Sequence, residues 1–138
     1  RLMSNIREDK GYTYGIGSYL LGYPEGSILG ISSSTDNAFV EPLIDEAVRE
    51  LDRLSSGDFT DDEMSRLRRY AMSTLASSLD STFEIMDYHI DSKIAFLPED
   101  YFERQVDETM SLTSDELVRV AREHLSVGDL TVVVAGGK

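Results

Sequence analysis

The sequence contains no cysteine among its 138 residues. Disulfide bonds, thiol nucleophiles and cysteine-ligated zinc are therefore excluded, although the redox compartment stays open. Lysine is also scarce, because only Lys10, Lys93 and Lys138 are present, and 13 basic residues face 26 acidic ones. The formal net charge of −13 describes a surface that repels phosphate backbones, so we expect no nucleic-acid partner. An ordinary solvated acidic surface and adaptation to high salt are both compatible with this charge.

Long hydrophobic runs are missing as well, since the longest are short stretches such as Val132–Ala135. A membrane-spanning helix needs about 20 consecutive apolar residues, so we expect no membrane span. No basic, apolar leader opens the chain and no targeting signal is visible, which indicates a soluble protein of unknown compartment. The first residues already carry helix-like apolar spacing at Leu2, Met3 and Ile6, and they do not begin with methionine. We therefore expect a piece of a longer protein, cut inside or just before a helix.

The remaining sequence alternates between strand-like and helix-like patterns. Two strands, Tyr12–Leu21 and Ser27–Ser33, flank a turn-like Gly22–Gly26 and predict a hairpin. Further along the chain, Thr60–Glu63 and Thr113–Glu116 have the form of capping boxes that open helices. Helices are expected over residues 1–10, 35–54, 60–79, 82–96, a short segment opened by residue 98, and 113–125. Thr35 or Asp36 is expected to cap the second of these helices.

The closing segment, Asp129–Ala135, is a continuous valine-rich run and predicts a strand buried on both faces of the sheet. The apolar stripe Phe83, Met86, Ile90 and Ile94 predicts the packing face of its helix. The order of elements predicts an α+β fold, with a mostly antiparallel sheet and helices packed on one face. Residues 1–138 are expected to form a single domain.

No complete catalytic constellation can be found in the sequence. His89 and His124 lie far apart and belong to neither His-Glu-x-x-His nor its inverse, so neither predicts a metal ligand. No serine lies in a nucleophile elbow. Gly11, Gly15 and Gly17 follow a helix and lie in a strand, unlike a dinucleotide-binding loop. The chain alone is therefore predicted to bind no catalytic zinc and to cleave no peptide.

The stretch "NIREDKGYTYGIGSYL", residues 5–20, is the most distinctive part of the chain. Gly11 fits the left-handed position that closes a helix, and a strand with Tyr12 and Tyr14 on one face follows it. The guanidinium of Arg7 offers a fixed fork of donors, and the hydroxyl of Tyr14 is a rigid donor. Such donors stabilise the negative charge that develops on a peptide carbonyl oxygen during hydrolysis. On the residues alone, the alternative stays open that Arg7 pairs with a nearby carboxylate and both tyrosines pack in the core.

Residues 1–20 resemble a motif of the pitrilysin/insulinase-type zinc metallopeptidases, the family that includes mitochondrial processing peptidase. Ile6–Gly11 matches the family's Leu-Arg-Glu-x-x-Gly helix end, and Tyr14 stands at its tyrosine position, seven residues after Arg7. The similarity continues in three later segments, which are "STDNAFVEPLIDEAVRELDRL", "GDFTDDEMSRLRRYAMSTLASSL" and "LTSDELVRVAREHLSVGDLTVVVAGG". In this family the inverted zinc motif belongs to the other half of the protein, and it is absent here.

The resemblance implies that the chain is the later part of a C-terminal, non-zinc peptidase domain, truncated at its N-terminus. Its implied function is to bind peptide substrate through Arg7 and Tyr14, with zinc held by the missing half. The implied partner is that zinc-binding half, on the same protein or on a homologous subunit. The parent would be a zinc metalloendopeptidase or its inactive partner. Two alternatives stay open: a non-catalytic homologue acting as scaffold or partner subunit, and an unrelated α+β binding module.

Overall fold

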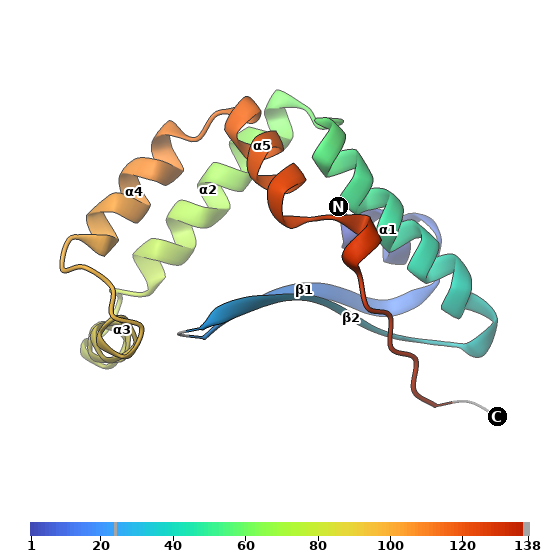
Figure 1. The fold of residues 1–138 in the computed structure, drawn as a ribbon, viewed down its shortest axis with the longest axis horizontal. Coiled ribbons are helices and arrows are strands. Elements are labelled where there is room, and N and C mark those ends of the chain that lie inside the picture. Colours follow the sequence, from blue (N-terminus) through green and yellow to red (C-terminus); the bar gives the residue numbers. More distant parts are fainter. Residues whose placement is uncertain (24, 137–138) are drawn as a thin grey trace. The chain divides into compact units, whose positions relative to one another are not determined.

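The computed structural model describes residues 1–23 and 25–136, which group into two compact units. The first unit comprises Arg1–Gly22, Ser27–Asp58 and the chain from Val118 onward, whereas the second comprises Tyr23–Gly26 and Phe59–Leu117. The α-helices and strands of both units are labelled in Figure 1. The predicted α+β class is confirmed, since a two-stranded sheet is combined with several helices.

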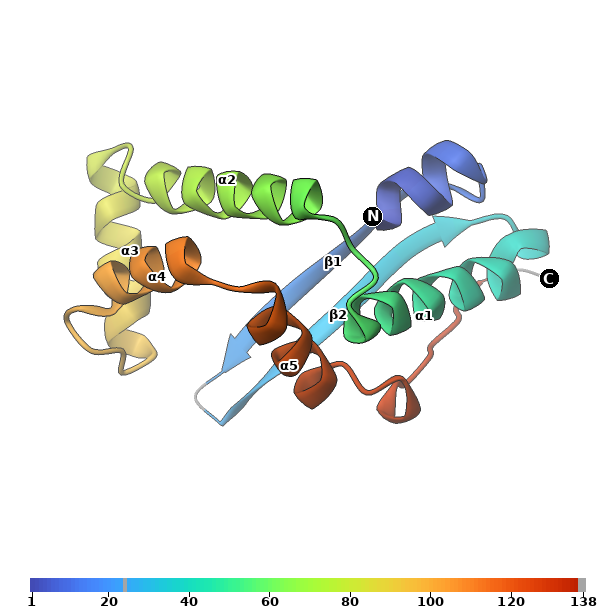
Figure 2. The same ribbon diagram turned by 90° about the horizontal axis from the view of Figure 1, so that it is seen from above.

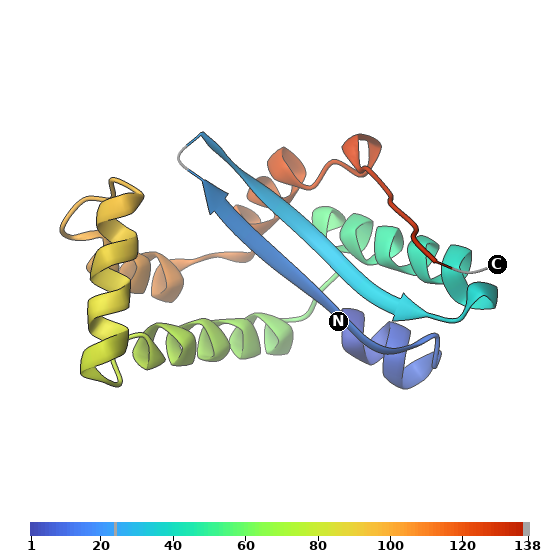
Figure 3. The same ribbon diagram turned by 90° about the horizontal axis from the view of Figure 1, so that it is seen from below.

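The sheet of the first unit is the predicted hairpin. Strand β1 (Thr13–Tyr23) pairs with strand β2 (Gly26–Thr35), and the two run in opposite directions, as Figure 3 shows. Each strand differs from its predicted bounds by one or two residues at either end, which is ordinary for bounds estimated from pattern. The turn predicted between them includes Pro24, which lies outside the described residues.

The segment before β1 is helical, as predicted, but it is a π-helix, η1 (Met3–Asp9). The N–H of Lys10 donates to the carbonyl of Asn5 at 3.1 Å, and the N–H of Gly11 donates to the carbonyl of Arg7 at 3.1 Å. Gly11 has φ +66°, which confirms the predicted left-handed residue after the helix. π-Helical turns are rare and occur frequently at functional sites.

Helix α1 (Val40–Ser56) lies across one face of the hairpin (Figure 2) and follows a 3₁₀ turn, η2 (Asn37–Phe39). The first unit has its core here, where η1, β1 and α1 bury a cluster of apolar side chains, which are Ile6, Ile16, Leu43 and Ala47. Sequence pattern predicted a helix capped by Thr35 or Asp36. The Asp36 side chain makes no capping hydrogen bond, because the 3₁₀ turn separates it from the start of α1.

The predicted closing strand, Asp129–Ala135, is wrong. A short 3₁₀ turn, η3 (Val127–Asp129), is followed by residues without regular structure, and Val133 is 83% exposed. A valine-rich run favours a strand, but a strand forms only where another backbone takes up its hydrogen bonds. In the described part of the chain the sheet holds β1 and β2 alone, and this segment pairs with neither of them.

The second unit is helical and is built from α2 (Asp61–Ser77), α3 (Thr82–Ile94), α4 (Tyr101–Ser111) and the start of α5 (Ser114–His124). Helices α2 and α4 lie side by side (Figures 1 and 3). The Arg68 guanidinium on α2 donates to the carbonyl of Leu112 at 2.5 Å, just beyond α4.

Both predicted capping boxes are confirmed. The Glu63 N–H donates to the Thr60 hydroxyl at 3.2 Å, and the Thr60 N–H donates back to the Glu63 carboxylate at 2.8 Å. The same reciprocal pair joins Thr113 and Glu116 at the start of α5, at 3.2 and 2.9 Å. Each box satisfies two backbone donors that a helix N-terminus otherwise leaves unpaired.

Helix α3 ends two residues before its predicted bound, and its predicted packing face is not buried. The exposed fractions of Phe83, Met86, Ile90 and Ile94 are 75%, 51%, 45% and 63%, and no residue of α3 is fully buried. The stripe has the spacing of a packed helix face, but nothing among the described residues covers it. None of the helices in the described ranges is long and apolar enough to cross a membrane.

Candidate functional site

Arg7 and Tyr14, the two residues singled out by the motif, are both exposed, and Tyr14 is 95% exposed. Within residues 1–23 and 25–136, no hydrogen bond or ion pair engages either side chain. Arg7 therefore does not pair with a carboxylate in the described chain, and Tyr14 does not pack in its core. The structure leaves both groups of donors free to meet another molecule, and their role as substrate contacts stays a prediction.

The backbone around Arg7 is attached to α1 on both sides of that residue. Ile6 is 0% exposed and lies in the core cluster of the first unit. The Asn5 side-chain amide donates to two carboxylates on α1, those of Glu46 and Glu50. The Lys10 ammonium also donates to Glu46. The exposed Arg7 is thus carried on a turn whose flanking residues are fixed.

Glu46 is one of two carboxylates on α1 that are almost completely buried, with 6% of its surface exposed. It accepts from Lys10 Nζ at 2.6 Å, from Asn5 Nδ2 at 3.1 Å and from the Arg49 guanidinium. The hydrogen bond from Lys10 lowers the pKa of Glu46, and Asn5 and Arg49 add to this effect against the burial that raises it. Glu46 is therefore held as a carboxylate at neutral pH.

Glu50 follows one helical turn later and is 5% exposed. It accepts from Arg1 Nε at 2.8 Å, from Asn5 Nδ2 at 2.8 Å and from an Arg53 guanidinium nitrogen at 3.0 Å. Burial raises the pKa of Glu50, but the hydrogen bonds from Arg1 and Asn5 and the charges of Arg1 and Arg53 outweigh it, so the net direction is downward. Asn5 therefore bridges both buried carboxylates.

Sequence reasoning missed this pair, because acidic residues on a helix usually lie on its solvated face. A signal was present, since Glu46 and Glu50 are four residues apart and border the apolar positions Leu43 and Ala47. Residues four apart lie on the same helix face, so the two carboxylates were placed beside the core. Donors from η1 and the residues beside it, together with Arg49 and Arg53 on α1, make their burial possible.

Tyr14 is likewise preceded by an anchored residue. The buried Thr13 hydroxyl lies 2.6 Å from the carbonyl of Ser34, accepts from the Ser33 hydroxyl at 2.8 Å, and accepts from the Gly15 N–H at 3.1 Å. These contacts tie β1 to β2 at the residue before Tyr14.

Tyr12 has a different environment from Tyr14. Its ring stacks on Phe39 with centroids 5.3 Å apart, and its carbonyl accepts from the Thr35 hydroxyl. Tyr12 is half-buried, and it packs against the core cluster. Core packing, the alternative for both tyrosines, therefore holds for Tyr12 and not for Tyr14.

The family resemblance implies zinc in the missing half of the protein, and the residues described here do not form a zinc site of their own. No group of three or more histidine, aspartate or glutamate side chains that could hold a metal ion occurs among the described residues. His89 lines a cavity in the second unit, and His124 lies in the first unit, 3.9 Å from Glu123. A catalytic zinc needs three convergent ligands.

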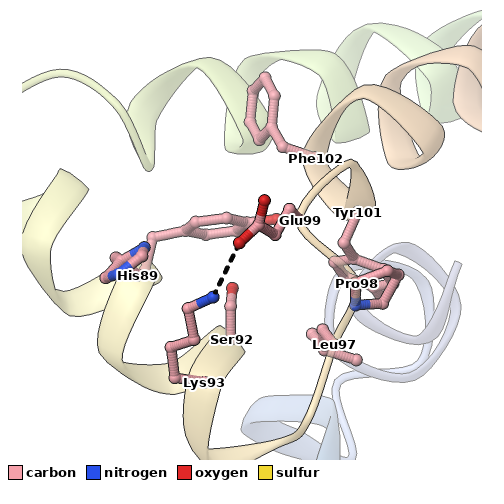
Figure 4. Close-up of a pocket in the computed structure, with 9 residues that line it drawn as sticks. His89, Ser92, Lys93, Leu97, Pro98, Glu99, Tyr101 and Phe102 are labelled. Atoms are coloured by element: carbon pink, nitrogen blue, oxygen red, sulfur yellow. Dashed lines mark ion pairs between the residues drawn. The ribbon is translucent and has the colours of Figure 1, made fainter.

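A cavity of about 160 Å³ lies beside the loop between α3 and α4 (Figure 4). Lys93 Nζ lies 3.5 Å from the Glu99 carboxylate, and the Tyr88 ring meets the Phe102 ring edge-on at 5.7 Å. The charged groups at the cavity thus pair with each other, and the volume is below the roughly 300–1,000 Å³ of small-molecule sites. The lining residues are Tyr88, His89, Ser92, Lys93, Leu97, Pro98, Glu99, Tyr101 and Phe102.

In a comparison with known families, residues 1–70 match the family described as "Peptidase M16 inactive domain". The matched range contains Arg7, Tyr14, Glu46 and Glu50. A curated relative, an uncharacterized zinc protease of Streptomyces coelicolor, is 24% identical over 125 residues, which is 91% of this chain and 27% of the relative.

Two solved structures share the fold. A protease from Helicobacter pylori has a TM-score of 0.78 at 22% identity, and a peptidase M16 inactive domain from Pseudomonas fluorescens has a TM-score of 0.79 at 24% identity. Each match covers 91% of this chain and 30% of the other. The chain therefore spans less than a third of the length of the proteins that it matches.

Proposed function

The chain belongs to the family of peptidase M16 inactive domains, and from this membership we propose that it is the substrate-binding, non-zinc half of a zinc-dependent peptidase. The observation that carries the proposal is the exposure of Arg7 and Tyr14, without partners in the described chain, on backbone that is anchored beside each of them. Zinc belongs to a partner half, on the same polypeptide or on a homologous subunit. That partner supplies the metal chemistry, and this chain supplies the hydrogen-bond donors of Arg7 and Tyr14 for the bound peptide.

Arg7 and Tyr14 can both donate to a carbonyl oxygen of a bound peptide. The guanidinium stays charged and offers several N–H groups in a rigid fork, while the phenol offers one O–H. When the halves close, water is excluded and these donors become stronger electrostatically than they are in solution. Their contribution is then to orient the peptide and to stabilise the negative charge that develops on its oxygen.

The test is Tyr14→Phe in the assembled peptidase, meaning the polypeptide that carries this chain together with its zinc-binding half. The change removes one hydroxyl and almost no volume. Losing a transition-state donor costs about a hundredfold or more in kcat, so a drop of that size is expected with an unchanged melting temperature. Peptide turnover by Tyr12→Phe, just before β1, is the neighbouring control, and turnover by Tyr70→Phe, at a residue on α2 that is 73% exposed, is the control for exposure.

The alternative is a non-catalytic homologue that acts as a scaffold or partner subunit. Such a homologue would belong to the same family and would also have no zinc ligands in this chain. If the Tyr14→Phe variant kept wild-type turnover, that result would favour this alternative over the proposal. The other alternative, an unrelated α+β binding module, is wrong, because the family match covers half of the chain.

A further inference from the structure

The turn that carries Arg7 is held by directional polar contacts to buried groups. Asn5 donates to Glu46 at 3.1 Å and to Glu50 at 2.8 Å, and Lys10 donates to Glu46 at 2.6 Å. The exposed residues of this turn, 7–9, lie between these two points of attachment. Asn5 precedes Arg7 by two residues and Lys10 follows it by three, so the contacts bracket the arginine.

We propose that Asn5, Lys10 and Glu46 are positioning residues, which fix the backbone of η1 so that Arg7 is presented to the substrate in one orientation. The inference rests on the proposed function of Arg7 as a substrate contact. None of the three touches the substrate, and each acts through the turn.

Two features argue that the contacts serve geometry more than stability. Burying a carboxylate is costly, and buried ion pairs can often be replaced by apolar side chains without loss of stability. Glu46 is buried on a helix that already packs through Leu43 and Ala47, where an apolar residue would fit the same face. Hydrogen bonds from Asn5 and Lys10 add what an apolar contact lacks, which is a fixed direction for the η1 backbone.

The π-helical form of η1 is a second reason why contacts are needed to hold its backbone. Its backbone hydrogen bonds are those of a π-helix, which is wider and rarer than an α-helix. Without the flanking contacts, we expect the segment to adopt the regular α-helical form. A regular helix would rotate Arg7 relative to Asn5 and Lys10. A catalytic group that is misplaced by about 1 Å can lose about a hundredfold in rate, so holding this turn matters for a donor at Arg7.

The experiment is a double-mutant cycle between Lys10 and Arg7 in the assembled peptidase, read by peptide turnover. Lys10→Met keeps the length of the stem and removes the charged donor, while Glu46 retains Asn5 and Arg49 as donors. We expect kcat to fall about tenfold or more with KM little changed. In the Arg7→Ala background the same change should have almost no further effect, because Lys10 then has no arginine to position. Lys10→Arg should restore most of the turnover.

Lys93→Met is the matched control, because it removes the same charged donor from an exposed pair with Glu99 in the second unit. Should Lys10→Met fail to fold, Glu46→Gln, which keeps the shape and still accepts hydrogen bonds, is carried through the same cycle. An equal loss in both backgrounds, or no loss with Arg7 present, would overturn the positioning role while leaving the role of Arg7 in place. If Arg7→Ala alone leaves turnover unchanged, the proposed function fails, and this inference fails with it.

Discussion

The ammonium of Lys10 lies 2.6 Å from the carboxylate of Glu46, which is only 6% exposed. This ion pair joins η1 to α1 and is much less exposed than the pairs elsewhere on the surface, such as Arg119 with Glu123. Exposed pairs contribute little to stability, whereas removing one partner of a buried pair leaves a charge without compensation. The attachment of η1 therefore depends on the ionisation of Glu46.

Acid should detach this turn. The folded-state pKa of Glu46 is lowered from its ordinary value near 4.5, with the hydrogen bond from Lys10 as the largest cause. A lowered pKa means that the contribution to stability is complete above the ordinary value and is lost as the pH falls through the folded-state value. We expect the melting temperature of the assembled protein to fall as the pH is lowered from about 7 to below about 4.

Glu46→Gln separates this effect from other acid-sensitive groups, since it cannot ionise. The difference in melting temperature between wild type and Glu46→Gln should be largest near neutral pH and should shrink in acid. Glu123→Gln, which removes an exposed carboxylate, should leave the pH profile close to that of the wild type. A constant difference for Glu46→Gln at every pH would contradict the assignment.

The Thr13 hydroxyl should be needed to hold β1 against β2. Thr13→Val removes the hydroxyl with little change in volume and leaves the Ser33 hydroxyl and the Gly15 N–H without that partner. Losing a buried hydrogen bond costs about 1 kcal/mol. We expect faster amide hydrogen exchange in both strands, measured in the full protein. Thr74→Val, at an exposed position on α2, should leave exchange in the hairpin unchanged.

Features specified by neighbouring residues could be predicted from the sequence. A capping box needs only a threonine and a glutamate three residues apart, so those at Thr60 and Thr113 were found correctly. Gly11 was also found, because a left-handed residue at a helix end favours glycine whatever lies around it. The hairpin followed from two strand patterns separated by a short turn.

Features that depend on distant residues could not be predicted in the same way. The strand pattern of Asp129–Ala135 is genuine, but a strand forms only by pairing with another, and in the described residues this segment pairs with neither β1 nor β2. Burial of Glu46 and Glu50 requires donors from η1, more than thirty residues earlier in the chain. For the candidate site, the motif identified Arg7 and Tyr14, while the residues that fix their backbone became visible only in the structure.

Metal should be dispensable for this chain. Since the described residues offer no cluster of ligands, removing zinc from the assembled peptidase with a chelator should abolish peptide cleavage and leave amide exchange in residues 1–58 unchanged. His89→Ala and His124→Ala should leave the zinc content of the protein as it was, measured by metal analysis after dialysis. Loss of stoichiometric zinc in either variant would place a ligand in this chain and contradict the prediction.

Arg7→Lys is the sharpest test of the arginine, because it keeps the positive charge and removes the fork of donors. If charge alone attracted the peptide, turnover would be retained, and its salt dependence would match that of the wild type. A role as a directional donor instead predicts that kcat falls about tenfold or more while the melting temperature is unchanged, since no contact within the described chain is lost. Arg66→Lys on α2, whose guanidinium pairs with Asp62 at 3.4 Å and is 63% exposed, controls for the same substitution elsewhere. Equal turnover by Arg7→Lys and the wild type would reduce Arg7 to a surface charge, and Tyr14 would then be the only donor left in the proposal.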